Sequence, residues 1–193
     1  IIRNSILDGN ETSPDTDGSG AGLFIVDSSG VQIIDNRFQD NNTQHQRMVY
    51  GSAIYLNGSH NFWIEHNQFK YNYGHSVLCL RGSPAASDGF VGRNEWWGNS
   101  ALYNLELKGN INAKVENNFL GFRATSILSR SRGGASTDIT IVGDCLLGAA
   151  EVDLLFNTFA AADYGVMINE CSIVDIYNNI FSFKAQLKAE FII

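Results

Sequence analysis

The sequence predicts an all-β fold, a parallel β-helix in which the chain winds through stacked coils of short strands. The first observation is an eight-residue pattern, apolar-x-apolar-x-x-Asn-x-apolar, at residues 31–38, 62–69, 89–96, 113–120, 152–159 and 174–181. The second is an apolar-x-apolar pair that precedes each copy, and the third is the Gly, Asn and Ser content of the intervening turns. Alternating apolar and polar residues indicate strands with one buried face. A period of roughly 20 to 50 residues indicates a solenoid.

Each copy of the octet carries an asparagine at its sixth position, and a truncated copy at residues 1–6 extends the series toward the N-terminus. The series is Asn4, Asn36, Asn67, Asn94, Asn118, Asn157 and Asn179. Coils stack at the strand spacing of about 4.8 Å, so equivalent residues form columns. Stacked Asn side chains can bond from coil to coil. We therefore expect about seven coils and an architectural Asn ladder.

The apolar pairs predict a second strand in each coil, in register with its neighbours. They are Leu23 and Ile25, Ile54 and Leu56, Leu78 and Leu80, Leu105 and Leu107, Ile139 and Ile141, and Val166 and Ile168. Residues 139–146 also fit the octet, with Asp144 at the Asn position, but only thirteen residues separate Asp144 from Asn157. This interval is too short for a complete coil. Residues 139–142 are therefore predicted to be the first strand of the Asn157 coil.

The octets, such as residues 33–38 (IIDNRF) and 64–69 (IEHNQF), resemble the short repeats of right-handed parallel β-helix proteins of the pectate-lyase-like class. Such repeats occur in many secreted carbohydrate-active proteins, phage tailspikes and periplasmic proteins. The resemblance spans nearly the whole chain and implies a right-handed parallel β-helix. It specifies function weakly, because one fold hosts many activities.

The activity motifs of individual carbohydrate-active families differ in this chain. Asn157-Thr158 is followed by Phe159 where polygalacturonase-like hydrolases carry Asp, and Gly74-His75 is followed by Ser76 where they carry Gly. The pectate-lyase calcium and arginine motifs and the epimerase motif Asp-Pro-His-Asp do not occur in the sequence. These departures argue against those three activities. A different glycoside hydrolase, transglycosidase or polysaccharide lyase stays open, as does a protein without catalysis.

Length and termini predict one domain, residues 1–193, that is incomplete at both ends. Residue 1 lies inside a repeat, and residues 191–193 (FII) resemble the strand that opens a further coil. β-Helices need capped ends, and neither cap is recognisable here. We expect a fragment whose ends meet flanking domains or further copies of the chain.

The whole-chain charge argues against nucleic acid as a partner. The formal net charge is −7 and there is no Lys/Arg cluster, whereas phosphate binding needs a basic face. No apolar run approaches the roughly 18 residues of a membrane span. No cofactor is expected. Ca²⁺ is the open possibility, because Asp8, Glu11, Asp15 and Asp17 lie in one polar segment whose spacing does not match the calcium-loop motif.

The three cysteines, Cys79, Cys145 and Cys171, have no metal-type spacing. We expect small residues in or beside the core, with Cys79 at an outward strand position where its thiol could be exposed. Trp96 occupies an inward position of its octet and is expected in the core.

Alternation also assigns side chains to the outside of the solenoid. Four residues before the Asn, the outward column is Gln32, Trp63, Phe90, Lys114, Asp153 and Asp175. Two residues before it, the column is Ile34, Glu65, Gly92, Glu116, Leu155 and Tyr177. On the preceding strand it is Phe24, Tyr55, Cys79, Glu106, Thr140 and Met167.

The mixture of carboxylates and aromatic rings on this surface is typical of sites where sugar rings stack and acids contact hydroxyls or glycosidic oxygens. The candidate catalytic residues are Asp153, Asp175, Glu116 and Glu65, and the candidate substrate-binding residues are Trp63, Lys114, Tyr177 and Trp97. Asp153 and Asp175 are expected about 4.8 Å apart in adjacent coils. Glu116 and Asp153 are expected on the order of 8 Å apart, a separation that inverting glycosidases use.

Two functions are predicted. The first is an extracellular or cell-surface protein that binds or processes a polysaccharide or oligosaccharide through this acid and aromatic face. The alternative is a structural or adhesive β-helix, a stalk, tailspike or filament segment without catalysis, and the absent catalytic motifs and caps favour it. A homo-oligomer is compatible with either.

Overall fold

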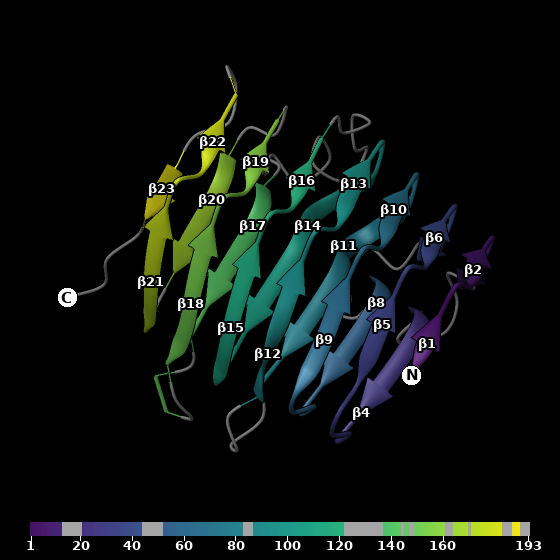
Figure 1. Ribbon diagram of the computed structural model, residues 1–193, viewed down its shortest axis with the longest axis horizontal. Coiled ribbons are helices and arrows are strands. Elements are labelled where there is room, and N and C mark those ends of the chain that lie inside the picture. The colour runs from purple at the N-terminus through teal and green to yellow at the C-terminus, as the bar shows by residue number, and fades with distance from the viewer. Residues whose placement is uncertain are drawn as a thin grey trace.

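The computed structural model describes ten segments of the chain, and every regular element in them is a strand. These segments are residues 1–12, 21–43, 52–82, 87–121, 137–143, 145–146, 149–160, 164–169, 171–182 and 187–189. The strands form a parallel β-helix whose coils follow one another across Figure 1, from the N-terminal coil at the right to the C-terminal coil at the left. The predicted solenoid is confirmed. No helix in the described segments is long and apolar enough to cross a membrane.

Three parallel sheets make up the walls of the solenoid. Sheet A contains β1 (Ile2–Arg3), β5 (Gln32–Ile34), β9 (Phe62–Glu65), β12 (Ser87–Gly92), β15 (Ile111–Glu116), β18 (Ala150–Leu155) and β21 (Ser172–Tyr177). Sheet B contains β2 (Ile6–Asp8), β6 (Arg37–Gln39), β10 (Gln68–Lys70), β13 (Glu95–Trp97), β16 (Phe119–Leu120), β19 (Thr158–Phe159) and β22 (Ile180–Phe181). Sheet C contains β3 (Glu11–Thr12), β4 (Ala21–Val26), β7 (Asn42–Thr43), β8 (Ser52–Asn57), β11 (Tyr73–Arg81), β14 (Ser100–Lys108), β17 (Thr137–Val142), β20 (Tyr164–Asn169) and β23 (Leu187–Ala189).

A coil therefore has three strands and not the two that the sequence predicts. The octet is not one strand: its first half belongs to sheet A and its last residues to sheet B. The chain bends between them because the residue before the ladder Asn has a left-handed backbone, with φ of 57° at Asp35, 55° at His66 and 54° at Arg93. This conformation is uncommon for residues other than glycine. The bend turns the ladder Asn into the solenoid interior.

The Asn ladder is present and continuous from Asn36 to Asn179. Each Nδ2 donates to the Oδ1 of the Asn in the next coil, at distances between 3.0 and 3.1 Å. Each Oδ1 also accepts the backbone N–H of the Asn before it, as Asn94 Oδ1 does from Asn67 N at 2.9 Å. Each Nδ2 also donates to a backbone carbonyl of the preceding coil, as Asn94 does to Ile64 at 2.9 Å. The ladder thus pairs buried backbone groups at the bends.

The prediction for Asn4 is wrong by one residue. Ile2 is paired with Ile33 and Arg3 with Ile34, so Asn4 is equivalent to the bend residue Asp35. Asn4 accordingly has a φ of 53°. Ser5 takes the ladder position, and its backbone N–H donates to Asn36 Oδ1 at 2.9 Å.

A second Asn ladder, which the octet pattern does not predict, lies five residues further along the chain. Asn10, Asn41, Asn72 and Asn99 form it, with Nδ2 to Oδ1 distances of 2.7, 2.8 and 3.0 Å between successive members. These side chains stand at the corner between sheets B and C. Their Nδ2 atoms also donate to backbone carbonyls, such as that of Phe38 from Asn72 at 2.9 Å. Two corners of these coils are therefore held by amide ladders.

The interior of the solenoid is a continuous apolar core that the three sheets enclose. Phe38, Phe69 and Trp96 stack on one another in successive coils, with ring centroids 5.3 and 4.8 Å apart. Trp96 is fully buried, as predicted. The six apolar pairs of sheet C are all in register, for example Leu105 with Ile139 and Leu107 with Ile141. Residues 139–142 belong to β17, which confirms their assignment to the Asn157 coil.

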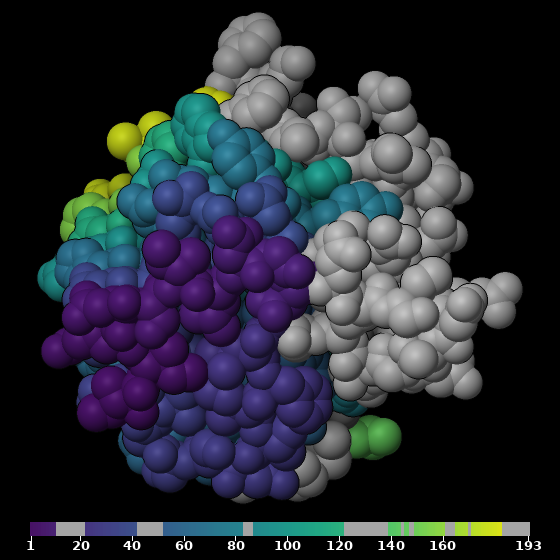
Figure 2. Space-filling model, turned by 90° about the vertical axis from the view of Figure 1, so that its right-hand side faces the viewer, coloured from purple at the N-terminus to yellow at the C-terminus, as the bar shows by residue number. Residues whose placement is uncertain are grey.

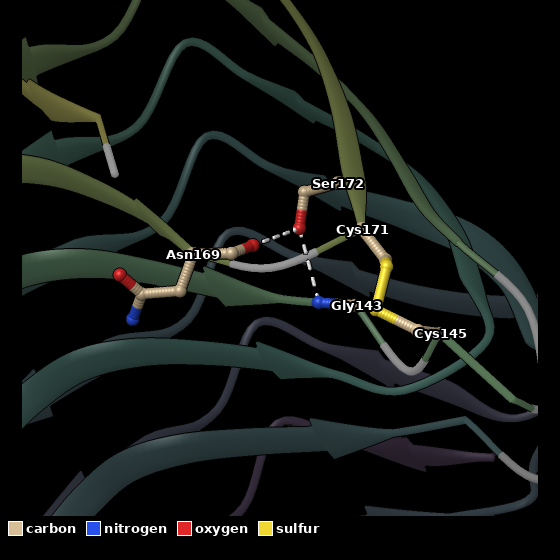
Figure 3. Close-up of a disulfide and its surroundings, with 5 residues drawn as sticks. All are labelled: Gly143, Cys145, Asn169, Cys171 and Ser172. Atoms are coloured by element: carbon tan, nitrogen blue, oxygen red, sulfur yellow. Dashed lines mark hydrogen bonds between the residues drawn. A yellow bond between two sulfur atoms is a disulfide. The ribbon is translucent and has the colours of Figure 1, made fainter. Parts of the chain in front are cut away.

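Viewed along the stack from its N-terminal end, the first coils lie in front of the others (Figure 2). A disulfide joins two coils near the opposite end, between Cys145, which follows β17, and Cys171, which precedes β21. Its two Cα atoms lie 5.3 Å apart, and the Ser172 hydroxyl beside it accepts from Gly143 N and donates to Asn169 O (Figure 3). Both cysteines are exposed, so the expectation of core residues is wrong for this pair.

Candidate functional site

The outer face of sheet A carries a groove of about 650 Å³ that crosses β9, β12, β15 and β18. Its lining residues are Asn61, Phe62, Trp63, Glu65, Asp88, Gly89, Phe90, Arg93, Asn112, Lys114, Glu116 and Asp153. A second hollow of about 270 Å³ shares Asn112 and Asp153 with the groove and extends to Asp175 on β21. The two hollows form one surface, here called the sheet A groove, that runs along the stack of coils.

The strand register places the predicted outward column along this groove. Trp63 is paired with Phe90, Phe90 with Lys114, Lys114 with Asp153, and Asp153 with Asp175, each on the neighbouring strand. Side chains at paired positions of parallel strands point to the same face. Five of the predicted site residues, Trp63, Glu65, Lys114, Glu116 and Asp153, therefore line one groove, and Asp175 lies in its extension.

One end of the sheet A groove is aromatic. The Trp63 ring is 44% exposed, and its centroid lies 4.4 Å from that of Phe90 at an angle of 31°. The Phe90 ring lies over Gly92, where an added Cβ would come within 2.1 Å of the ring. A side chain at Gly92 would displace the Phe90 ring from its present place beside Trp63.

Glu65 lies beside the Trp63 ring and is 9% exposed, although it occupies an outward position. Its Oε2 accepts the Trp63 indole N–H at 2.7 Å. Its Oε1 forms an ion pair with Arg93 Nη1 and lies 3.6 Å from His66 Nε2. Both carboxylate oxygens are therefore engaged by neighbouring side chains.

The middle of the groove holds a second ion pair, Lys114 Nζ with Glu116 Oε2 at 2.5 Å. Asn117 Nδ2 donates to the other Glu116 oxygen at 3.2 Å. Lys114 is thus both the register partner of Asp153 and the counterion of Glu116.

The far end of the groove is acidic. Asp153 and Asp175 are both exposed and occupy paired positions on β18 and β21. No Lys, Arg or His in the described segments forms an ion pair with either carboxylate. Glu151 lines the same hollow. This end of the groove therefore presents three exposed carboxylates, those of Glu151, Asp153 and Asp175.

Two predicted substrate-binding residues lie elsewhere. Trp97 is 40% exposed but belongs to β13 of sheet B, where its ring stacks on Phe119 with centroids 6.4 Å apart. Tyr177 is 56% exposed on β21 and is not among the residues that line either hollow. The structure does not bring these two side chains into the groove.

Sequence reasoning missed Arg93, Asp88 and Asn112, which also line the groove. Asp88 and Asn112 are paired on β12 and β15, two residues before Phe90 and Lys114. Extending the period-two alternation by one step would have found them. Arg93 stands at the bend before Asn94 with a φ of 54°, and the octet pattern carries no signal for the direction of such a side chain.

The described residues contain no group of three or more His, Cys, Asp or Glu side chains that could hold a metal ion. Of the acids considered for Ca²⁺, Asp8 is among these residues, whereas the Glu11 side chain, Asp15 and Asp17 lie outside them.

Sheet C corrects the third outward column. Phe24 is exposed, but Tyr55, Cys79, Glu106 and Thr140 are 1 to 4% exposed. Within this column, the Tyr55 ring stacks on Phe24 with centroids 5.1 Å apart, and the Glu106 carboxylate accepts a hydrogen bond from the Ser76 hydroxyl.

The Cys79 thiol is one of these buried groups. Burial, together with the charge of Glu106, raises the pKa of the Cys79 thiol well above its ordinary value. Cys79 is therefore a protonated, unreactive thiol.

Glu106 is the centre of a buried polar cluster. Ser76 Oγ donates to its Oε2 at 2.6 Å, and His75 Nε2 lies 3.5 Å from the same oxygen. Burial by itself would raise the pKa of Glu106, but the hydrogen bonds of His75 and Ser76 and the positive charges of His75 and Lys108 outweigh it and lower the pKa. Glu106 is thus held as a carboxylate.

Acid should destabilise the protein through Glu106. A carboxyl group whose pKa is lower in the folded than in the unfolded protein stabilises the fold above its unfolded pKa and loses this contribution as the pH falls through the folded pKa. We expect the free energy of unfolding to fall as the pH decreases below about 4.5, the ordinary value, and Glu106→Gln to show a shallower fall. Urea unfolding at several pH values from about 3 to about 7, on either side of the ordinary carboxyl pKa, measures the free energy of unfolding of the original protein and of the variant. Parallel pH profiles for the two proteins would contradict this role of Glu106.

Comparison with known proteins gives one match. The model of the family described as right handed beta helix region matches residues 1–120. No curated protein and no solved structure matches the chain significantly. The matched region covers more than half of the chain and agrees with the three parallel sheets. The chain therefore belongs to the right-handed β-helix family.

Proposed function

We propose that this β-helix protein binds a polysaccharide or oligosaccharide chain along the sheet A groove. The observation that carries the proposal is the exposed Trp63 side chain, which packs against Phe90 at one end of a groove whose other end presents Asp153 and Asp175. A sugar ring has an apolar face that stacks on an aromatic ring, and its hydroxyls donate to carboxylates. The groove offers both contacts in one line along the coils.

The charges of the groove favour an uncharged sugar chain over an anionic one. Arg93 and Lys114 are the cationic residues that line it, and they are already paired with Glu65 and Glu116. Asp153, Asp175 and Glu151 leave an excess of negative charge. A polyuronate would meet repulsion along most of the groove.

The catalytic extension of this proposal assigns general acid chemistry to Asp153 and Asp175, with Glu116 as the third candidate. Its support is the pairing of Asp153 and Asp175 on adjacent strands, which places their Cα atoms about 4.8 Å apart. Carboxylate pairs at short separation are what glycoside hydrolysis uses.

An extracellular or cell-surface location is part of the proposal. The exposed disulfide between Cys145 and Cys171 supports it, because such bonds persist in oxidising compartments and are rare in the cytosol.

Replacing Trp63 by alanine tests the binding function. We expect the variant to bind a neutral oligosaccharide about 10-fold more weakly than the original protein, a loss of about 1.4 kcal/mol, because the stacking surface is removed. Isothermal titration calorimetry against a panel of neutral, acidic and amino-sugar chains measures the affinity, and the same samples can be assayed for new reducing ends.

Trp97→Ala is the matched control, because Trp97 has a similar exposure but lies on sheet B. It should leave the affinity unchanged. An equal loss in both variants, or no heat with any chain of the panel, would contradict the proposal, and the second outcome would favour the structural or adhesive alternative.

A further inference from the structure

We infer that Glu65 is a positioning residue that fixes the Trp63 ring for stacking, and that it acts on the ligand only through this ring. The inference rests on the proposed function of the sheet A groove. It assigns to Glu65 a role other than the general acid that its place in the outward column suggests.

The first argument is the way in which the Glu65 carboxylate is occupied. Oε2 accepts the Trp63 indole N–H at 2.7 Å, and Oε1 is paired with Arg93 Nη1. A proton donor must come within hydrogen-bond distance of the glycosidic oxygen. Both oxygens of Glu65 are instead in contact with side chains of the protein.

The second argument is burial. The side chain of Glu65 is 12% exposed, whereas that of its partner Arg93 is 55% exposed. Trp63 is 44% exposed, and its ring lies against Phe90. Because Glu65 accepts the indole N–H, its carboxylate lies at the edge of the ring, and it is less exposed than Trp63 itself.

The third argument is the freedom that an exposed indole would otherwise have. Trp63 projects from the outer face of β9, where an unrestrained side chain samples several rotamers. The hydrogen bond at Nε1 fixes the ring plane, and the Arg93 pair fixes Glu65 from the opposite side. A pre-ordered ring loses less conformational entropy on binding.

A double-mutant cycle tests this role. In Glu65→Leu the acceptor is lost, and we expect affinity for the neutral oligosaccharide to fall about 10-fold. In Glu65→Gln an oxygen acceptor remains, and affinity should stay within about 3-fold of the original. In the Trp63→Ala background, Glu65→Leu should cause no further loss, because residues that act as one unit are not additive. Glu95→Leu, on sheet B, is the control for the substitution itself.

The indole N–H signals in a ¹⁵N-labelled protein give a second measurement that needs no ligand. Trp63→Phe identifies the Trp63 signal, which should shift and exchange faster with water in Glu65→Leu and stay in place in Glu65→Gln. An unchanged Trp63 signal in Glu65→Leu would overturn the inference. So would a further 10-fold loss of affinity on adding Glu65→Leu to Trp63→Ala, because Glu65 would then contact the ligand itself. If the original protein binds no sugar, the proposed function fails, and the Trp63 signal still decides whether Glu65 positions the ring.

Discussion

Replacing Asn94 by alanine is expected to lower the free energy of unfolding by about 3 to 6 kcal/mol. The Asn94 side chain is buried and takes part in four interactions: its Oδ1 accepts from Asn67 N and Nδ2, and its Nδ2 donates to Ile64 O and Asn118 Oδ1. Alanine would remove the side-chain partner of Asn67 N and of Ile64 O, whereas Asn67 Nδ2 and Asn118 Oδ1 keep other hydrogen bonds. Each orphaned buried group costs about 1 to 3 kcal/mol. The cost should be large because water cannot enter the packed bend to replace the amide.

Urea unfolding followed by circular dichroism measures this loss. Asn112→Ala is the matched control, since Asn112 is an exposed asparagine on the outer face of the same sheet. We expect it to change the free energy of unfolding by less than about 0.5 kcal/mol. Similar midpoints for the two variants would show that the ladder does not stabilise the coils in the way described.

Trp96→Ala is the second substitution with a large expected effect, about 3 to 5 kcal/mol. Trp96 is fully buried and stacks on Phe69 with centroids 4.8 Å apart. Alanine would leave a cavity that the rigid walls of the solenoid cannot close. The same unfolding experiment gives the magnitude.

Trp96→Phe separates packing from hydrogen bonding at this position. The Trp96 Nε1 is buried, and no partner for it is found within the described segments. Phenylalanine keeps the stacked ring and removes this unpaired donor, so we expect a loss below about 1.5 kcal/mol. A Phe variant as unstable as the Ala variant would contradict the importance of the aromatic stack.

The sequence predicts the parallel β-helix well because the octets, the ladder asparagines and the apolar pairs all indicate the same stacking of coils. The octet fixes which face is buried, and the ladder asparagines and the apolar pairs of sheet C fix the register. The register then places Trp63, Lys114, Asp153 and Asp175 in one column before any coordinates are known. The alternation of strand side chains is thus sufficient to assemble most of the groove.

The sequence does not reveal the first ladder residue, the bend inside the octet or the direction of the Arg93 side chain. Each of these depends on the backbone angles of a single residue. Nothing in the truncated first repeat distinguishes Asn4 from Ser5, because both ladder and bend positions accept asparagine. The residue before each ladder Asn looks like any other polar or apolar position, and only its left-handed φ reveals that the octet is two strands. The direction of the Arg93 side chain depends on this bend.

The disulfide was missed for a different reason. Cys145 and Cys171 are separated by 26 residues and share no motif. The register of sheet C pairs Val142 with Asn169, and counting forward from that pair brings the two cysteines to the same corner. The information was present in the repeat, but it appears only after the coils have been aligned.

The two amide ladders have a direction. In every step the amide nitrogen on the N-terminal side gives its hydrogen to the oxygen on the C-terminal side. A coil turned upside down would set nitrogen against nitrogen at the C-terminal end of a ladder and oxygen against oxygen at its N-terminal end. The ladders therefore favour extension by coils of the same polarity, which is a head-to-tail arrangement.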